Sequence, residues 1–229
     1  MKPVNDFAPP VLLRNRHAQS ILNSLKLRRP IVLQRARHML KWSSSHILDC
    51  GDGVRLQGYY SGHRSAKNDL CILIHGWEGS SESSYLLSAA GTLWKNNFDV
   101  FRLNMRDHGP THHLNEGLFH SCRILEVTGA VKSIQKLFPH KRLFLGGFSL
   151  GGNFAMRVAL HAPHAGIKLH HVVAVCPVLS GPQQAATLCR TVAFYAIRSP
   201  CVKALQDLPD RQLWRETRGT ANSQSVLRI

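Results

Sequence analysis

The sequence has no run of 18 apolar residues, no apolar stretch near its start and no C-x-x-C pair. The first two absences mean that neither a membrane-spanning helix nor a secretory leader is indicated. Six cysteines are spread widely along the chain, and reduced thiols in the cytoplasm are the expectation. G-x-G-x-x-G and a glycine-rich loop followed by lysine are also missing, so no cofactor is expected.

Acidic residues are scarce: 13 Asp and Glu stand against 29 Lys and Arg, which gives a net charge of +16. The excess gathers at the start, where residues 1–41 hold nine basic residues and one acidic residue. We therefore divide a single domain into a basic arm (1–41), a core (42–181) and a divergent tail or start of a cap (182–229). The arm could be a solvated basic surface or could make peripheral contact with an anionic membrane. A nucleic-acid role is disfavoured, because no module fingerprint is present.

Short apolar runs alternate with helical patterns along the core. This alternation predicts a mostly parallel sheet with helices on both faces. The expected strands are His46–Leu48, Val54–Tyr60, Leu70–Ile74, Val100–Leu103, Leu143–Leu145 and Val172–Val175. The expected helices are Ser84–Lys95, Arg123–Phe138 and Gly152–His161.

The most informative motif is G-x-S-x-G at residues 147–151, with Ser149 at its centre. It lies between an apolar strand pattern and a helix pattern. Glycines two residues on either side of a serine let the chain turn sharply between strand and helix and present the hydroxyl alone. The motif in this setting predicts the nucleophile elbow of an α/β-hydrolase, with Ser149 as the catalytic nucleophile.

A second motif, His75-Gly76-Trp77-Glu78-Gly79, follows the apolar run that ends at Ile74. In this fold the loop after the third strand gives one backbone N–H to the oxyanion hole, and the residue after the nucleophile gives the other. The amides of Trp77 and Leu150 are therefore the expected oxyanion donors.

Five blocks in order make the chain resemble the YheT-like branch of the α/β-hydrolases, a group of esterases. The blocks are Asn15–Leu22, Leu48–Gly53, His75–Ser81, Leu103–Gly109 and Gly146–Asn153. The resemblance covers residues 7 to about 180. It implies a carboxylic ester substrate, small or lipid, and an acyl-enzyme formed on Ser149.

The resemblance also implies a triad acid and then a triad histidine after Ser149, each following a further strand. Asp207 and Asp210 follow Ser149, but no histidine occurs after His171. The expectation is a chain cut short or read out of frame after Ser180, with the strands that carry the acid and the base missing. The triad acid and base are then unknown, and poor turnover of esters is expected.

Other histidines offer two alternatives. His75, His108 or His120 could replace the missing base, since all three lie in or near loops. His108, His112 and His113, or His161 and His164, could suggest a metal. No metallohydrolase motif fits, and Pro163 is expected to break the helix that would align the second pair, so no metal site is predicted.

Two further segments carry amphipathic patterns. Residues Thr187–Ile197 could form one helix that covers the edge of the strand at Val172–Val175, or could begin a cap over the site. Ala18–Leu27 has an amphipathic pattern that is more typical of a helix docked on its own domain than of a membrane anchor. The sequence as a whole predicts a serine hydrolase acting on esters. The alternative is a non-catalytic module that uses its basic arm to bind anionic lipid, nucleic acid or a protein partner.

Overall fold

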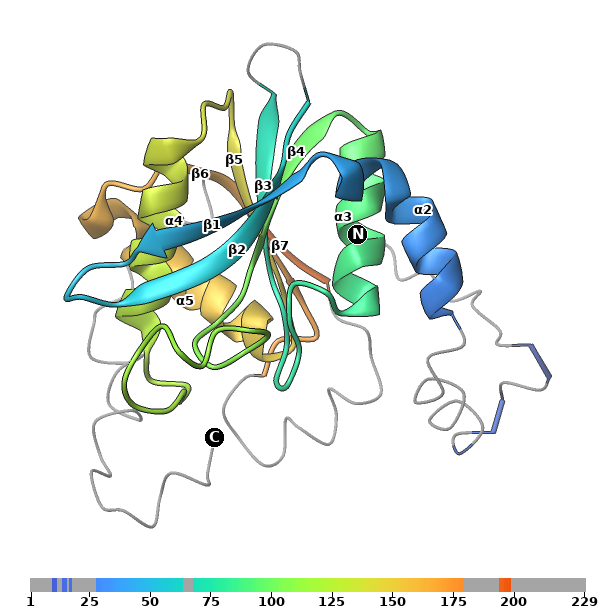
Figure 1. Cartoon of the computed structure of the whole chain (residues 1–229), viewed down its shortest axis with the longest axis horizontal. Coiled ribbons are helices and arrows are strands. Elements are labelled where there is room, and N and C mark those ends of the chain that lie inside the picture. The colour runs from blue at the N-terminus through green and yellow to red at the C-terminus, as the bar shows by residue number, and fades with distance from the viewer. Residues whose placement is uncertain are drawn as a thin grey trace.

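The computed structural model describes residues 10, 11, 14, 15, 17, 28–63 and 68–178, and the backbone of 194–198. Its strands form one sheet in the order β1-β2-β4-β3-β5-β6-β7 (Figure 1). The strands β3, β4, β5 and β6 are parallel to one another, whereas β2 and β7 run antiparallel to their neighbours. The bounds are β1 Ser43–Asp49, β2 Arg55–Ser61, β3 Asp69–Ile74, β4 Phe98–Leu103, β5 Leu143–Phe148, β6 Leu169–Val175 and β7 Phe194–Arg198.

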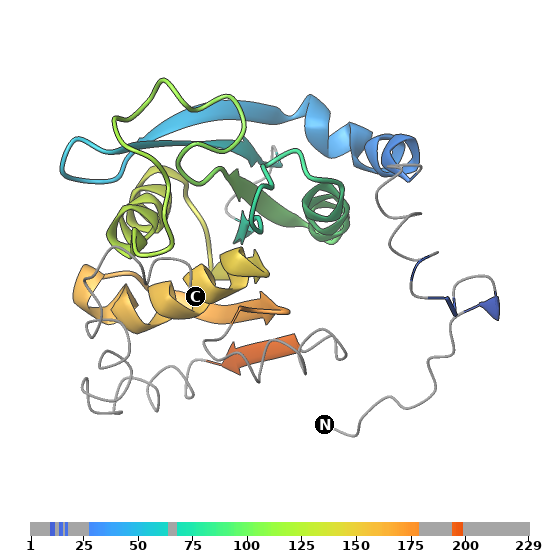
Figure 2. The same ribbon diagram turned by 90° about the horizontal axis from the view of Figure 1, so that it is seen from below.

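Helices cover both faces of this sheet (Figure 2). On one face, α4 (Ile124–Leu137) and α5 (Leu150–Ala165) pack over the larger core cluster. On the other face, α3 (Ser84–Lys95) packs on the sheet and α2 (Arg29–Lys41) packs on α3. None of the helices in the described residues is long and apolar enough to span a bilayer.

The central strands are apolar on both faces because both faces are covered. In β3, the five residues from Leu70 to Ile74 are all buried, and β4 is buried from Asp99 to Leu103. Alternate residues enter opposite clusters: Ile72 lies in the cluster under α4 and α5, and Leu73 in the cluster under α3. Such runs are the pattern of parallel strands between two helical layers.

The predicted α/β-hydrolase architecture is confirmed. All six predicted strands and all three predicted helices are present, and Ser84–Lys95 matches α3 at both ends. The sequence patterns missed α2, although Pro30 near its start and the buried positions Val32, Ala36 and Met39 mark a helix. Ala18–Leu27 lies outside the described residues.

Two expectations were wrong. Pro163 does not end the helix, because α5 continues to Ala165 and ends at Gly166, which has a left-handed backbone. The expected helix at Thr187–Ile197 is contradicted at its end, where Phe194–Arg198 forms β7. The free edge of β6 offers unpaired backbone groups, and an antiparallel strand pairs with them where a helix would not. Residues 187–193 lie outside the described residues.

Candidate active site

Ser149 occupies the turn between β5 and α5 with backbone angles φ 52° and ψ −116°. This conformation is rare for a residue with a side chain and carries strain of roughly 1–3 kcal/mol. The residue is exposed, while Gly147 and Leu150 beside it are buried. The turn therefore has the geometry expected from the motif: a serine alone at the carboxyl edge of the sheet.

The glycines of the motif are required by close packing. A methyl group at Gly147 would collide with the carbonyl oxygen of Gly151, and one at Gly151 would collide with the carbonyl oxygen of His75. Because the first contact is within the turn and the second is with the residue after β3, the motif brings the turn and the β3 loop together.

Hydrogen bonds fix the turn to β6. The Ser149 amide donates to the carbonyl oxygen of Val175 at 2.8 Å, and the Asn153 amide donates to the Ser149 carbonyl oxygen at 3.1 Å. The side-chain amide of Asn153 donates to the carbonyl oxygen of Val178 at 2.8 Å. A strained residue persists only where its surroundings determine it strongly, and these bonds come from two different elements.

The loop after β3 lies beside Ser149. A Cβ atom built on Gly76 would be 3.3 Å from the Cβ atom of Ser149, and the Gly76 amide donates to the Tyr85 hydroxyl at 2.9 Å. Trp77 follows, and this residue is 62 % exposed. Leu150 opens α5, where backbone amides have no partner within the helix. Both expected oxyanion donors therefore come from loops at the same sheet edge, and their convergence on one oxygen remains a prediction.

His75 is fully buried, and both of its ring nitrogens are used. Nε2 accepts a hydrogen bond from the Met105 amide at 3.1 Å, so the proton is on Nδ1, which donates to the Gly76 carbonyl oxygen at 2.7 Å. Burial lowers the pKa of His75 to about 4. Its position makes it a structural link between the loops after β3 and β4 rather than a base for Ser149.

His108 and His120 are the other two candidate bases. The Nδ1 atom of His108 donates to the Arg106 carbonyl oxygen at 2.6 Å, since a carbonyl oxygen can only accept. The centroid of the His108 ring lies 4.8 Å from that of His75. His120 is largely exposed, and the partial loss of water around its ring, together with the nearby charge of Arg123, lowers its pKa. Within residues 28–63 and 68–178, no histidine ring forms a hydrogen bond with the Ser149 hydroxyl. Asp207 and Asp210 lie outside the described residues.

The histidine clusters do not assemble a metal site in the part of the chain that the structure describes, where no group of three His, Cys, Asp or Glu could hold an ion. His112 is 3.9 Å from Asp107, but 73 % of its side chain is exposed. His161 and His164 share α5 because Pro163 leaves the helix intact.

The sequence patterns missed the pair that anchors the loop after β4. Arg106 and Glu126 are both buried and form an ion pair at 2.9 Å. Arg106 also donates to the carbonyl oxygen of Glu116 at 2.6 Å. The arginine lies in one of the five blocks quoted above, but its glutamate partner on α4 is 20 residues away and carries no local signal. This pair holds the loop that carries His108 and Phe119 near the elbow.

The family model for the alpha/beta hydrolase fold matches residues 70–196. Among solved structures, the Pyrococcus furiosus esterase Pf2001 is 24 % identical with a TM-score of 0.51, covering 59 % of this chain and 51 % of its own. Est1E from Butyrivibrio proteoclasticus, solved with ferulic acid bound, is 20 % identical with a TM-score of 0.53, covering 72 % and 71 %.

Esterase Est22 is 18 % identical with a TM-score of 0.55, and the match covers 74 % of this chain and 55 % of that one. The chain thus spans about half the length of several esterases that it resembles. The comparison with curated proteins gives no significant match. At these identities the structural matches establish the fold alone. The family model covers more than half of the sequence. The chain belongs to the alpha/beta hydrolase fold family.

Proposed function

We propose that this protein is a serine hydrolase of the YheT-like branch that acts on carboxylic esters, with Ser149 as its nucleophile. The observation that carries the proposal is the turn at Ser149: an exposed serine at φ 52°, between a parallel strand and a helix, next to Gly76 of the β3 loop. A turn between a strand and a helix that had only a structural role would require neither a strained backbone nor a serine at this position.

In the proposed reaction the Ser149 oxygen attacks the ester carbonyl, and the resulting oxyanion accepts hydrogen bonds from the amides of Trp77 and Leu150. The serine proton passes to a base and then to the departing alcohol, which leaves an acyl-enzyme. Water, deprotonated by the same base, then attacks the acyl carbon and releases the acid. The loops supply the nucleophile and the oxyanion donors of this scheme.

The scheme requires a base for the Ser149 proton, and none of the candidate histidines is placed as one. A serine hydroxyl is a weak nucleophile until a base accepts its proton. His75 is occupied on both nitrogens, and the ring contacts of His108 are with His75 and Phe119. We therefore expect only weak ester turnover. In a well-studied serine protease, loss of the triad leaves about 10³–10⁴-fold over water.

The test is hydrolysis of p-nitrophenyl butyrate by the full chain and by Ser149→Ala, each with and without added imidazole. Imidazole supplies an external base, so the serine chain should gain rate from it, after subtraction of the rate that Ser149→Ala shows at the same imidazole concentration. Mass spectrometry should find the acyl group on Ser149. Equal rates for both chains under both conditions would contradict the proposal.

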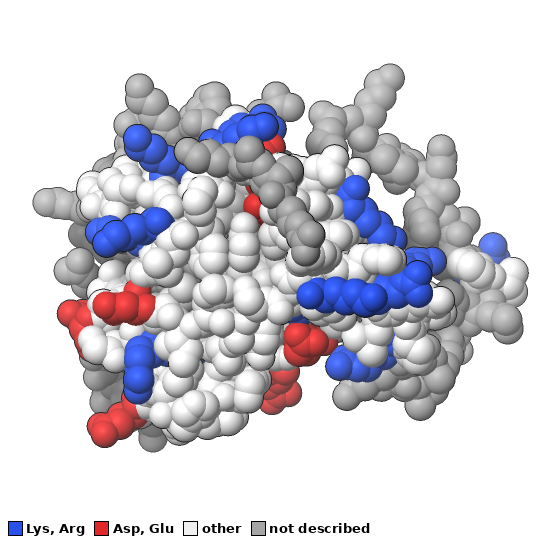
Figure 3. Space-filling view, turned by 45° about the horizontal axis from the view of Figure 1, so that its top comes forward, with Lys and Arg blue, Asp and Glu red and all other residues white. Residues whose placement is uncertain are grey.

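The second candidate is a binding module for anionic membranes, and α2 is the observation that favours it. Arg35, Arg37 and Lys41 are exposed on this helix, and basic side chains lie along the α2 side of the molecule (Figure 3). This function would need no base and would be independent of Ser149.

A further inference from the structure

The two faces of the sheet are covered unequally near β5 and β6. On the face under α4 and α5, Val172 and Ala174 of β6 are completely buried. On the opposite face, Val173 and Val175 of the same strand are only partly buried, as are Phe144 and Phe148 of β5. Among the described residues, α3 is the helix that packs on this second face, and it lies against β3 and β4.

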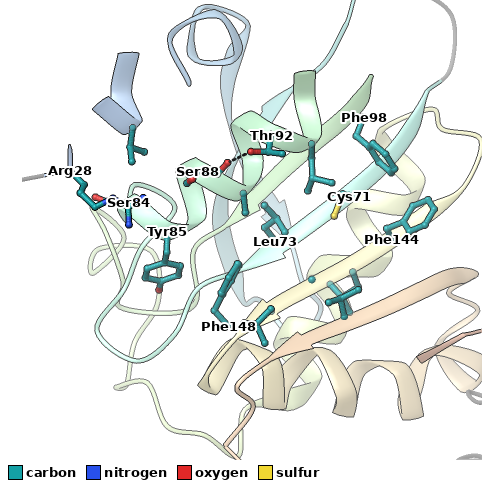
Figure 4. A pocket seen from close by; sticks show the side chains of 18 of the residues that line it. Arg28, Cys71, Leu73, Ser84, Tyr85, Ser88, Thr92, Phe98, Phe144 and Phe148 are labelled. Carbon is teal, nitrogen blue, oxygen red and sulfur yellow. Dashed lines mark hydrogen bonds between the residues drawn. The ribbon is translucent and has the colours of Figure 1, made fainter. Parts of the chain in front are cut away.

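The partly covered face forms one wall of a groove of about 730 Å³, and α3 forms the other wall (Figure 4). This volume lies within the range of sites that hold one small ligand, roughly 300–1,000 Å³. The wall is mostly apolar. Its main apolar side chains are Leu73, Leu93, Phe98, Phe144, Phe148 and Val173.

The groove has a polar end and an apolar end. Since α3 runs back from the carboxyl edge of the sheet to the start of β4, Tyr85 lies at the elbow end and Leu93 at the far end. Arg28 and Arg29 line the elbow end, and Figure 4 shows Arg28 beside Ser84 and Tyr85, away from Phe98 and Phe144. Both charges thus lie at one end of a long apolar channel.

The charge at this end is not cancelled by an acid in the groove. None of the described residues that line it is acidic. Arg29 is steadied by donating to the carbonyl oxygen of Glu82 at 3.1 Å, while the carboxylate of Glu82 pairs with Arg102 at 2.7 Å. The other polar groups are hydroxyls, such as that of Thr92, which donates to the Ser88 carbonyl oxygen.

We propose that this groove binds one long-chain fatty acid, with its carboxylate at Arg28 and Arg29 and its chain along β3, β5 and β6. An unbranched apolar chain with one anionic end complements a channel that is apolar along its length and basic at one end. Ser149 does not line the groove, so this site is separate from the proposed reaction centre and does not depend on it.

The experiment measures oleate binding to the full chain carrying Ser149→Ala, by calorimetry and by displacement of a fluorescent fatty acid. Binding should show one site per chain, and the uncharged oleyl alcohol should bind at least about tenfold more weakly, because it makes no charge-assisted contact. Use of the alanine variant keeps the result independent of ester hydrolysis.

Three variants locate the site. The double variant Arg28→Glu, Arg29→Glu should weaken oleate binding at least about tenfold. The variant Lys132→Glu, Lys136→Glu, which makes the same charge change on α4 across the sheet, should leave oleate binding unchanged. Val173→Phe fills the groove and should abolish binding. Far-UV circular dichroism shows whether each variant is folded, and Val173→Phe gives a readout that does not rely on the arginines.

Two results would overturn the proposal. One is oleate binding that none of the three variants changes, which would place the ligand elsewhere. The other is an absence of saturable oleate binding to the full chain.

Discussion

His75 makes the protein sensitive to acid. The unfolded chain binds a proton on this ring near the ordinary pKa of 6.5, while the buried ring, with its pKa of about 4, stays neutral. The unfolded state therefore gains a proton first as the pH falls. Protonation of His75 has no effect on the free energy of unfolding above about pH 6.5. As the pH falls from 6.5 to 4, it lowers the free energy of unfolding by about 3 kcal/mol in total.

We expect His75→Gln to be less stable at neutral pH but to lose less stability between pH 6.5 and 4. Urea unfolding at several pH values measures this slope. The matched control is His113→Gln, since His113 is exposed. If His75→Gln and the parent chain have the same slope, the proton uptake belongs to other groups.

The start of α5 packs against the end of β3 too closely for any side chain at Gly151. A methyl group at Gly151 would meet the backbone carbonyls of His75 and Ile74, neither of which can move without shifting the sheet. We expect Gly151→Ala to lower the free energy of unfolding by about 1–3 kcal/mol and to displace the turn at Ser149, with any ester activity lost as well.

Gly91→Ala on α3 is the matched substitution. Its methyl group would lie 3.4 Å from Ala36 of α2, an ordinary contact, and alanine favours a helix over glycine by about 1 kcal/mol. Urea midpoints should therefore separate the two variants clearly. Similar midpoints would mean that the turn relaxes and that the β3 loop does not restrain it.

Local patterns predicted the elements whose periodicity reflects a buried face, such as β3 and α3. They missed α2 because its apolar positions are interrupted by arginines and glutamine, and its partner Gly91 lies more than 50 residues away. They also failed at Phe194–Arg198, where the pattern predicted a helix. These residues form β7 because they pair with the edge strand β6. Such outcomes depend on neighbours that a window of sequence does not contain.

In the candidate site too, some residues could be predicted from local sequence and others could not. Ser149 and its glycines could be predicted because a sharp turn needs those residue types in one short motif. The role of His75 could not, because only the folded protein brings the Met105 amide to its ring. The Arg106–Glu126 pair is likewise made by the meeting of a loop and a helix.

For the whole molecule, the net charge of +16 predicts attraction to anionic surfaces. We expect the chain to bind phosphatidylserine vesicles and not phosphatidylcholine vesicles, and to be released at about 0.5 M NaCl as charges are screened. Each basic residue near such a surface contributes about 1 kcal/mol.

Cosedimentation of Arg35→Glu, Arg37→Glu should therefore show much weaker vesicle binding than the parent. Lys132→Glu, Lys136→Glu makes the same charge change on α4, across the sheet, and should retain most of the binding. Equal loss in both variants would assign the attraction to total charge rather than to α2.

Because of the strand order, β3 is synthesised well before one of the two strands that it pairs with. In the finished sheet Ile74 of β3 pairs beside Gly147 of β5, which is 73 residues later in the chain. At about 5–20 residues per second, a ribosome needs roughly 4–15 s to make this stretch. During that interval one edge of the most apolar strand has no partner, even after β4 has paired with the other edge. We therefore expect this edge to be most open to non-native pairing while the residues of α4 are being synthesised.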